Sequence, residues 1–97
     1  MKDYMRNLKE AIRAKYGCDC YHLRTTLVRK SFAGEPSWGG NVEVFELAGH
    51  RKAEIAYAWH YRDGEQKVRY VTQLASAKIR SPVQAVEAAV ESGEFSR

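Results

Sequence analysis

Two cysteines and a histidine occupy alternate positions of one short segment: Cys18, Cys20 and His22. In an extended strand alternate side chains point to the same side, and thiolate and imidazole groups are ligands that zinc accepts. His60, from another segment, is the candidate for a fourth ligand. The spacing lacks the paired Cys-x-x-Cys knuckles of structural zinc sites, so the pattern equally fits reduced cysteines that fill small spaces in a core. We therefore expect no metal and no cofactor.

Histidine is the usual side chain for acid or base chemistry near neutral pH, so His50 and His60 are candidates for it, although neither has a carboxylate partner that the sequence identifies. The segment 30–40, KSFAGEPSWGG, holds three glycines and two large aromatic residues, Phe32 and Trp38. Such a segment is either a surface arch packed on its own aromatic rings or a small-ligand site with a histidine nearby. No phosphate loop, serine elbow or paired-carboxylate motif occurs, so no catalytic residue is predicted.

Basic residues give the chain a net charge of +4, which favours anionic partners. Lys2, Arg6, Lys9 and Arg13 follow one another at spacings of four, three and four residues, so they form a stripe on a helix. Four further cations are expected to extend the stripe over the outer face of a sheet: Arg24, Arg62, Lys67 and Arg69. The partner would be nucleic acid or an acidic protein. The alternative is that the stripe is the solvated side of an amphipathic helix.

Two helices are predicted to flank the sheet. The first sixteen residues are predicted to form a helix with Met5, Leu8 and Ile12 on one face. Asp3 is its expected N-cap, and Gly17 is expected to end it. The second helix starts at the serine N-cap of Ser81-Pro82-Val83-Gln84 and stops at Gly93. The chain is expected to fray from about residue 93.

Four strands are predicted between the helices, at 20–30, 42–48, 53–62 and 68–74. In the first strand Tyr21, Leu23, Thr25 and Leu27 share the side expected to be buried. The third and fourth strands should pair and contribute Tyr57, Trp59 and Tyr70 to the core. The second strand is apolar on both sides, which predicts either a bulge or burial of both faces.

Short connections favour an α+β fold: helix, four-stranded antiparallel meander, helix, with both helices on one face. The 97 residues suit a single domain spanning 1–97. No apolar run approaches the roughly 20 residues of a membrane helix, and the start MKDYMRNLKE is unlike a secretory signal. We expect a cytoplasmic protein that does not enter a membrane.

The sheet face without helices is expected to carry a strip of small apolar residues: Val28, Val42, Val44, Ala56, Ala58 and Val71. An uncovered apolar strip favours self-association. A homodimer is therefore the alternative to a binding module for an anionic partner.

One further pattern extends over most of the chain. It comprises Gly34, Trp38, Gly40, the run 42–47 VEVFEL, Gly49-His50, Lys52-Ala53, Tyr57-Ala58-Trp59, and Ser81-Pro82 with the alanine-valine helix after it. This pattern resembles a group of short uncharacterised bacterial proteins of about this length. The resemblance implies a free-standing bacterial protein, and it implies no activity, cofactor or catalytic residue.

Overall fold

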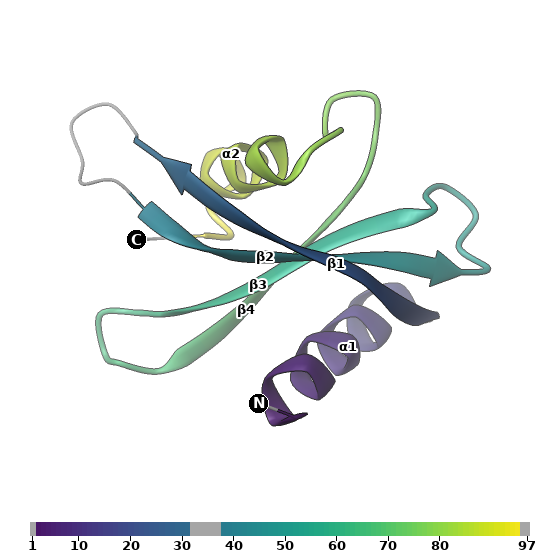
Figure 1. The fold of residues 1–97 in the computed structure, drawn as a ribbon, viewed down its shortest axis with the longest axis horizontal. Helices are drawn as coiled ribbons and strands as arrows, with labels where there is room; N and C mark the ends of the chain where they lie inside the picture. The colour runs from purple at the N-terminus through teal and green to yellow at the C-terminus, as the bar shows by residue number, and fades with distance from the viewer. Residues whose placement is uncertain (1, 32–37, 96–97) are drawn as a thin grey trace.

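The fold consists of two helices and four strands in a computed structural model that describes residues 2–31 and 38–95 (Figure 1). The element order is α1 (Lys2–Tyr16), β1 (Asp19–Lys30), β2 (Trp38–Ala48), β3 (Ile55–Arg62), β4 (Val68–Leu74) and α2 (Pro82–Ser92). The strands form one antiparallel sheet in the order β1-β2-β3-β4. The predicted α+β fold with an antiparallel sheet is therefore confirmed.

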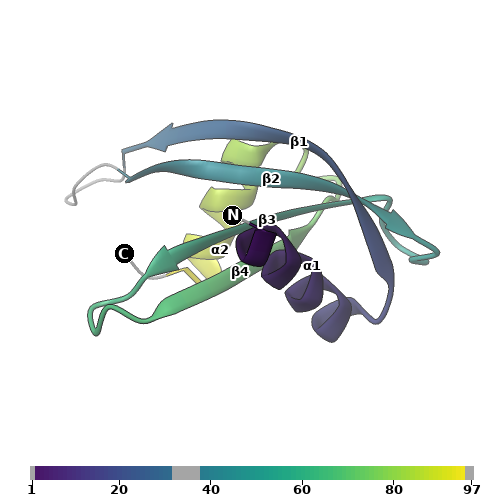
Figure 2. The same cartoon turned by 60° about the horizontal axis from the view of Figure 1, so that its bottom comes forward.

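The sheet is built from two long hairpins that meet over a short stretch. In the first hairpin, β1 pairs with β2 from Asp19 opposite Ala48 to Lys30 opposite Trp38. In the second, β3 pairs with β4 from Ala56 opposite Leu74 to Arg62 opposite Val68. The ladder between the hairpins joins only residues 43–46 to residues 55–58. The hairpins therefore cross near their middles, and β2 and β3 separate toward the Trp38 and Arg62 ends (Figures 1 and 2).

The two helices cover opposite faces of this sheet. Val44 and Phe45 are neighbours in β2 and both are fully buried, Val44 in a cluster with Val86 of α2 and Phe45 in a cluster with Leu8 of α1. Successive side chains of a strand point to opposite faces, so each helix packs on its own face. Figure 2 shows α1 in front of the strands and α2 behind them. The prediction that both helices share one face is wrong, whereas burial of both faces of β2 is confirmed.

The α2 face holds the larger aromatic cluster. Trp59 is fully buried there. The centroid of its ring lies 6.4 Å from that of Trp38 and 5.7 Å from that of Phe95. Phe95 is 2% exposed, and Glu94 lies 2.8 Å from the Nζ atom of Lys15. Residues 94 and 95 are thus packed against the fold, and the expected fraying from about residue 93 is wrong for them because Phe95 completes this cluster.

The six residues of the predicted uncovered strip are all buried, at 0–1% exposure: Val28, Val42, Val44, Ala56, Ala58 and Val71. The four valines belong to the cluster under α2, and the two alanines belong to the cluster under α1. Because a helix covers each face, this strip is not an exposed surface.

β1 differs most from its predicted pattern. Its register against β2 shifts between His22 and Arg24, so Leu23 is the extra residue of a bulge. Tyr21, Leu23 and Leu27 are 59%, 46% and 62% exposed, while the buried side chains of the strand are Cys20 and Val28. The side predicted to be buried is therefore exposed, because the strand lies at the sheet edge and the bulge breaks its alternation.

The helix ends follow local signals with one exception. Ser81 caps α2, since its Oγ accepts from the Gln84 backbone N–H, and Gly93 ends α2 with a left-handed φ of 81°. Gly17, with φ 72°, donates its N–H to the Arg13 carbonyl and follows α1. Asp3 lies inside the first turn of α1 and is not its N-cap. Neither described helix has the length and apolar character needed to cross a bilayer.

Candidate binding site

The candidate site lies on the face of the sheet against which α1 packs. It is the half of that face that lies beyond the first turn of α1, and we call it the open face. Cross-strand partners share a side, so the register defines its members: Leu27 and Arg29 from β1, Gly39 and Asn41 from β2, His60 and Arg62 from β3, and Val68 and Tyr70 from β4. Val68 and Tyr70 are each 38% exposed, and His60, Arg62 and Arg29 are exposed as well. Apolar and basic side chains thus mix on a surface that neither helix covers.

An aromatic row crosses the open face where α1 begins. The rings of Tyr4 and His60 lie 4.4 Å apart between centroids, and those of His60 and Tyr70 lie 6.2 Å apart. Asn7 of α1 donates to the Tyr70 hydroxyl over 3.0 Å. The pKa of His60 is lowered by burial and by the charge of Arg62, against an opposing effect of Glu43. The imidazole is therefore neutral at pH 7, and it adds an uncharged ring to the row.

Glu43 of β2 binds Tyr4, the first residue of the aromatic row, to the sheet. Its side chain is 3% exposed, and its carboxylate accepts hydrogen bonds from the Tyr4 hydroxyl over 2.8 Å and from the Thr25 hydroxyl. His22 Nε2 lies 2.8 Å from the same carboxylate. Burial and the Glu43 carboxylate raise the pKa of Tyr4, so its hydroxyl stays protonated as a donor. Glu43 is not among the residues predicted from the sequence, although an acid inside the apolar run VEVFEL was the available signal.

This Tyr4–Glu43–His22 arrangement contains groups typical of acid–base catalysis, but it is closed. The Tyr4, His22 and Thr25 side chains each contact the Glu43 carboxylate, and this carboxylate has almost no exposed surface. A general base must reach the proton that it removes from a substrate. The cluster is therefore suited to positioning α1 and Tyr4.

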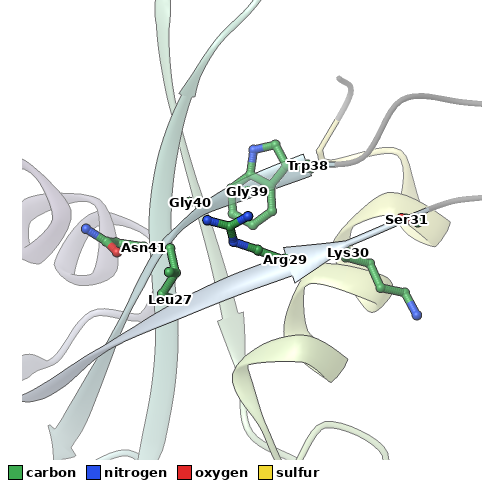
Figure 3. A pocket seen from close by; sticks show the side chains of 8 residues that line it. All are labelled: Leu27, Arg29, Lys30, Ser31, Trp38, Gly39, Gly40 and Asn41. Atoms are coloured by element: carbon green, nitrogen blue, oxygen red, sulfur yellow. The ribbon is translucent and has the colours of Figure 1, made fainter.

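Two arginines of the open face form no ion pair with a carboxylate among residues 2–31 and 38–95: Arg29 and Arg62. Within the described part of the chain, the Arg62 guanidinium donates to the backbone carbonyl of Gln66, over 3.1 Å. Figure 3 shows Arg29 and Lys30 leaving β1 in different directions. The Nζ atom of Lys30 lies 2.6 Å from Oε2 of Glu87 in α2, which agrees with the place of Lys30 on the α2 side of the sheet.

A groove opens where β2 and β3 separate. It encloses about 610 Å³, and its lining residues are Tyr4, Trp38, Gly39, Gly40, Asn41, His60, Tyr61, Arg62 and Phe95. Trp38 and His60, both predicted as ligand candidates, line this one groove. A second groove of about 760 Å³ lies on the β1 side of the same β2 residues and includes Leu27 and Arg29 (Figure 3). The first four residues of β2 therefore stand between two hollows.

Gly40 shapes the wall that both grooves share. A Cβ atom at this position would lie 2.7 Å from Cζ2 of Trp38, which is closer than such atoms approach. The missing side chain lets the Trp38 ring fold back over the strand toward Phe95, 5.1 Å away between centroids. The orientation of Trp38 thus depends on glycine two residues later.

The other predicted residues lie away from this site or serve other roles. His50 Nδ1 accepts from the backbone N–H groups of Lys52 and Ala53, over 3.0 and 3.2 Å, so His50 stabilises the turn before β3. Phe32 lies outside the described residues. Over the part of the chain that is described, no group of three His, Cys, Asp or Glu side chains could hold a metal ion. Cys18, Cys20 and His22, the weak zinc candidates of the sequence, are therefore not brought together as a metal site among these residues, and His22 contacts Glu43.

The predicted basic surface is not one surface. Arg24 pairs with Val44 and Arg69 pairs with Tyr61, so both lie on the α2 side of the sheet, whereas Arg62 lies on the α1 side. Several of the cations are also ion-paired: Arg6 with Asp3, Arg13 with Asp19, Lys67 with Glu65 and Arg69 with Asp63. Lys9 is exposed on α1, and the side chain of Lys2 is outside the described structure. The predicted extension of the helix stripe over one sheet face is therefore wrong.

Comparison of the chain with protein-family models, with curated proteins and with solved structures gives no match. The resemblance to short bacterial proteins stays an expectation.

Proposed function

We propose that the protein is a small non-enzymatic binding module whose anionic ligand lies on the open face. The observation that carries this proposal is the pair Arg29 and Arg62, which have no acidic partner in the described structure. Arg62 lines the groove between β2 and β3, and Arg29 lines the second groove on the other side of β2. A guanidinium presents a planar set of donors that suits phosphate and carboxylate groups.

The charge distribution around the groove supports an anion. Asp63, the carboxylate nearest in sequence to Arg62, accepts from Arg69 and from the backbone N–H groups of residues 65 and 67. Glu43 lies beneath Tyr4 and is satisfied by its own donors. Neither acid is free to neutralise the arginines, and the chain as a whole carries +4. The same reasoning favours nucleic acid over a neutral partner.

The test compares two arginines on one strand. Arg29 and Arg24 are both exposed residues of β1 without an ion pair among the described residues, but they lie on opposite sides. We expect Arg29→Glu and Arg62→Glu to weaken binding of a labelled mixed-sequence oligonucleotide about tenfold at roughly 50 mM salt, and Arg24→Glu to have a small effect. Fluorescence anisotropy measures the affinities.

Two outcomes would contradict the proposal. The unmodified protein could fail to bind both the oligonucleotide and inorganic polyphosphate at low salt. Alternatively, Arg24→Glu could weaken binding as much as Arg29→Glu, which would place the ligand elsewhere or indicate unspecific attraction.

Self-association is the second candidate function, and the edge strand β1 favours it. Tyr21, Leu23 and Leu27 are exposed along this edge, and an unpaired edge offers backbone groups to another strand. Sedimentation at high micromolar concentration tests it, and a monomer there would contradict it. The cytoplasmic location and the bacterial origin stay predictions.

A further inference from the structure

We infer that the open face binds single-stranded nucleic acid through its unpaired bases. This inference rests on the proposed function, because it names the class of anion that Arg29 and Arg62 would meet. The features that carry it are the aromatic row Tyr4–His60–Tyr70 and the groove beside it, neither of which a simple polyanion would need.

The aromatic row supplies what bases bind. Proteins that bind single strands combine cations along the backbone with aromatic rings on which bases stack. His60 and Tyr70 are exposed rings on neighbouring strands, and Arg62 stands two residues after His60 on the same side. Glu43 fixes Tyr4, and Asn7 fixes Tyr70, so the row is ordered before any ligand arrives. A preordered row loses little conformational entropy on binding.

The groove provides room for a base. Its volume of about 610 Å³ lies inside the range of roughly 300–1,000 Å³ that is typical of small-molecule sites. Trp38 and Tyr61 contribute aromatic surface to it, and the exposed amide of Asn41 can both donate and accept hydrogen bonds. A base that leaves the stacked row can therefore enter a site with apolar walls and a polar group.

The arginines of the open face favour a polyanion, and its aromatic row favours a single strand over a duplex. In a duplex the bases are stacked on one another, and only their edges and the phosphates are accessible. A duplex therefore satisfies the arginines but cannot use the row or the groove. We expect a single strand to bind more tightly than a duplex of the same sequence.

The experiment measures anisotropy with four labelled or competing probes: a single-stranded RNA and a single-stranded DNA of about 12 nucleotides, the corresponding duplex, and inorganic polyphosphate. At least one single strand should bind about tenfold more tightly than the duplex and the polyphosphate, and the two strands show whether ribose matters. Equal binding of all four probes would overturn the inference and leave the proposed function standing. No binding of any probe would overturn both.

Substitutions locate the bases. Tyr70→Ala and His60→Ala should each weaken single-strand binding about fivefold to tenfold and leave polyphosphate binding unchanged. Tyr21→Ala is the matched control, because Tyr21 is an exposed strand tyrosine that pairs with Glu46 on the other side of the sheet. Equal losses in Tyr70→Ala and Tyr21→Ala would overturn the inference. Should a variant fail to fold, NMR titration of the unmodified protein decides, since the His60 and Tyr70 signals must shift with a single strand and stay unmoved with polyphosphate.

Discussion

Glu43 is a buried acid whose removal should be costly. Tyr4, His22 and Thr25 all direct polar groups at its carboxylate, and these groups would lose an acceptor that is itself buried. We expect Glu43→Gln to lower the free energy of unfolding by about 2–4 kcal/mol, because an amide nitrogen would face donors. Urea unfolding followed by circular dichroism measures the change.

Tyr4→Phe is the matched control for that substitution, since it removes one donor and leaves the acceptor with its other partners. Its expected effect is about 1 kcal/mol. A Glu43→Gln protein as stable as Tyr4→Phe would show that the cluster does not hold α1 to the sheet.

His60 should make stability depend on pH in one direction. Burial and the Arg62 charge lower its pKa below the ordinary value of about 6.5, with Glu43 opposing and Tyr4 and Tyr70 as uncharged neighbours. Between the folded and unfolded values the unfolded chain binds more protons, so stability is full above about pH 6.5 and falls as the pH drops through the folded pKa. Urea midpoints from pH 8 to pH 5 should therefore decline less in His60→Gln than in the unmodified protein. A parallel decline would show that His60 is not the source of the pH dependence.

Among the elements, β2 depends most on close packing, because side chains cover both of its faces. Gly40→Ala puts a Cβ atom against the Trp38 ring, and this ring is packed against Trp59 and Phe95. We expect a loss of about 1–3 kcal/mol in stability, as for other overpacked sites. The tryptophan emission spectrum should change with the displaced ring.

Gly39→Ala is the control in the same strand. Its Cβ atom would lie 3.7 Å from Cγ of Arg29 and 3.9 Å from the Val28 carbonyl oxygen, which are ordinary contacts. The expected change is within about 0.5 kcal/mol. Equal losses at both glycines would mean that strand flexibility, and not the Trp38 ring, is what Gly40 provides.

The ends of the elements show how far a sequence determines local structure. Ser81, Gln84 and Gly93 act through bonds to neighbours within a few residues, so their roles in α2 could be predicted. The buried side of β1 could not, because the bulge at Leu23 shifts the alternation and nothing in the sequence marks it. Exposed apolar residues at an edge strand imitate the pattern of a buried face.

At the scale of the whole molecule, the arrangement of the hairpins is a non-local property. The meeting of Trp38 and His60 in one groove was predicted as a weak alternative, because both residues were recognisable as ligand candidates. Glu43 and the separation of β2 from β3 were missed, since both depend on contacts between segments far apart in the chain. The side of the sheet that each helix covers also depends on contacts between distant segments. The apolar residues on both faces of β2 nevertheless indicated that both faces are covered.

Helices on opposite faces predict two cores that respond independently. Ile12 and Phe45 lie in the cluster under α1, and Val86 lies in the cluster under α2, with the sheet between them. Ile12→Val should cost about 0.5–1.5 kcal/mol and Val86→Ala about 1–3 kcal/mol. Their effects on unfolding free energy should add within about 0.5 kcal/mol, because the two side chains share no neighbours.

The comparison pair is Ile12→Val with Phe45→Leu, which lie in one cluster and should couple by more than about 0.5 kcal/mol. Urea unfolding of the single and double variants gives both coupling energies. If both helices lay on one face, Ile12 and Val86 would belong to a common core, and their coupling would match that of the comparison pair. A small coupling across the sheet beside a large one within the α1 cluster is the result that the opposite placement of α1 and α2 requires.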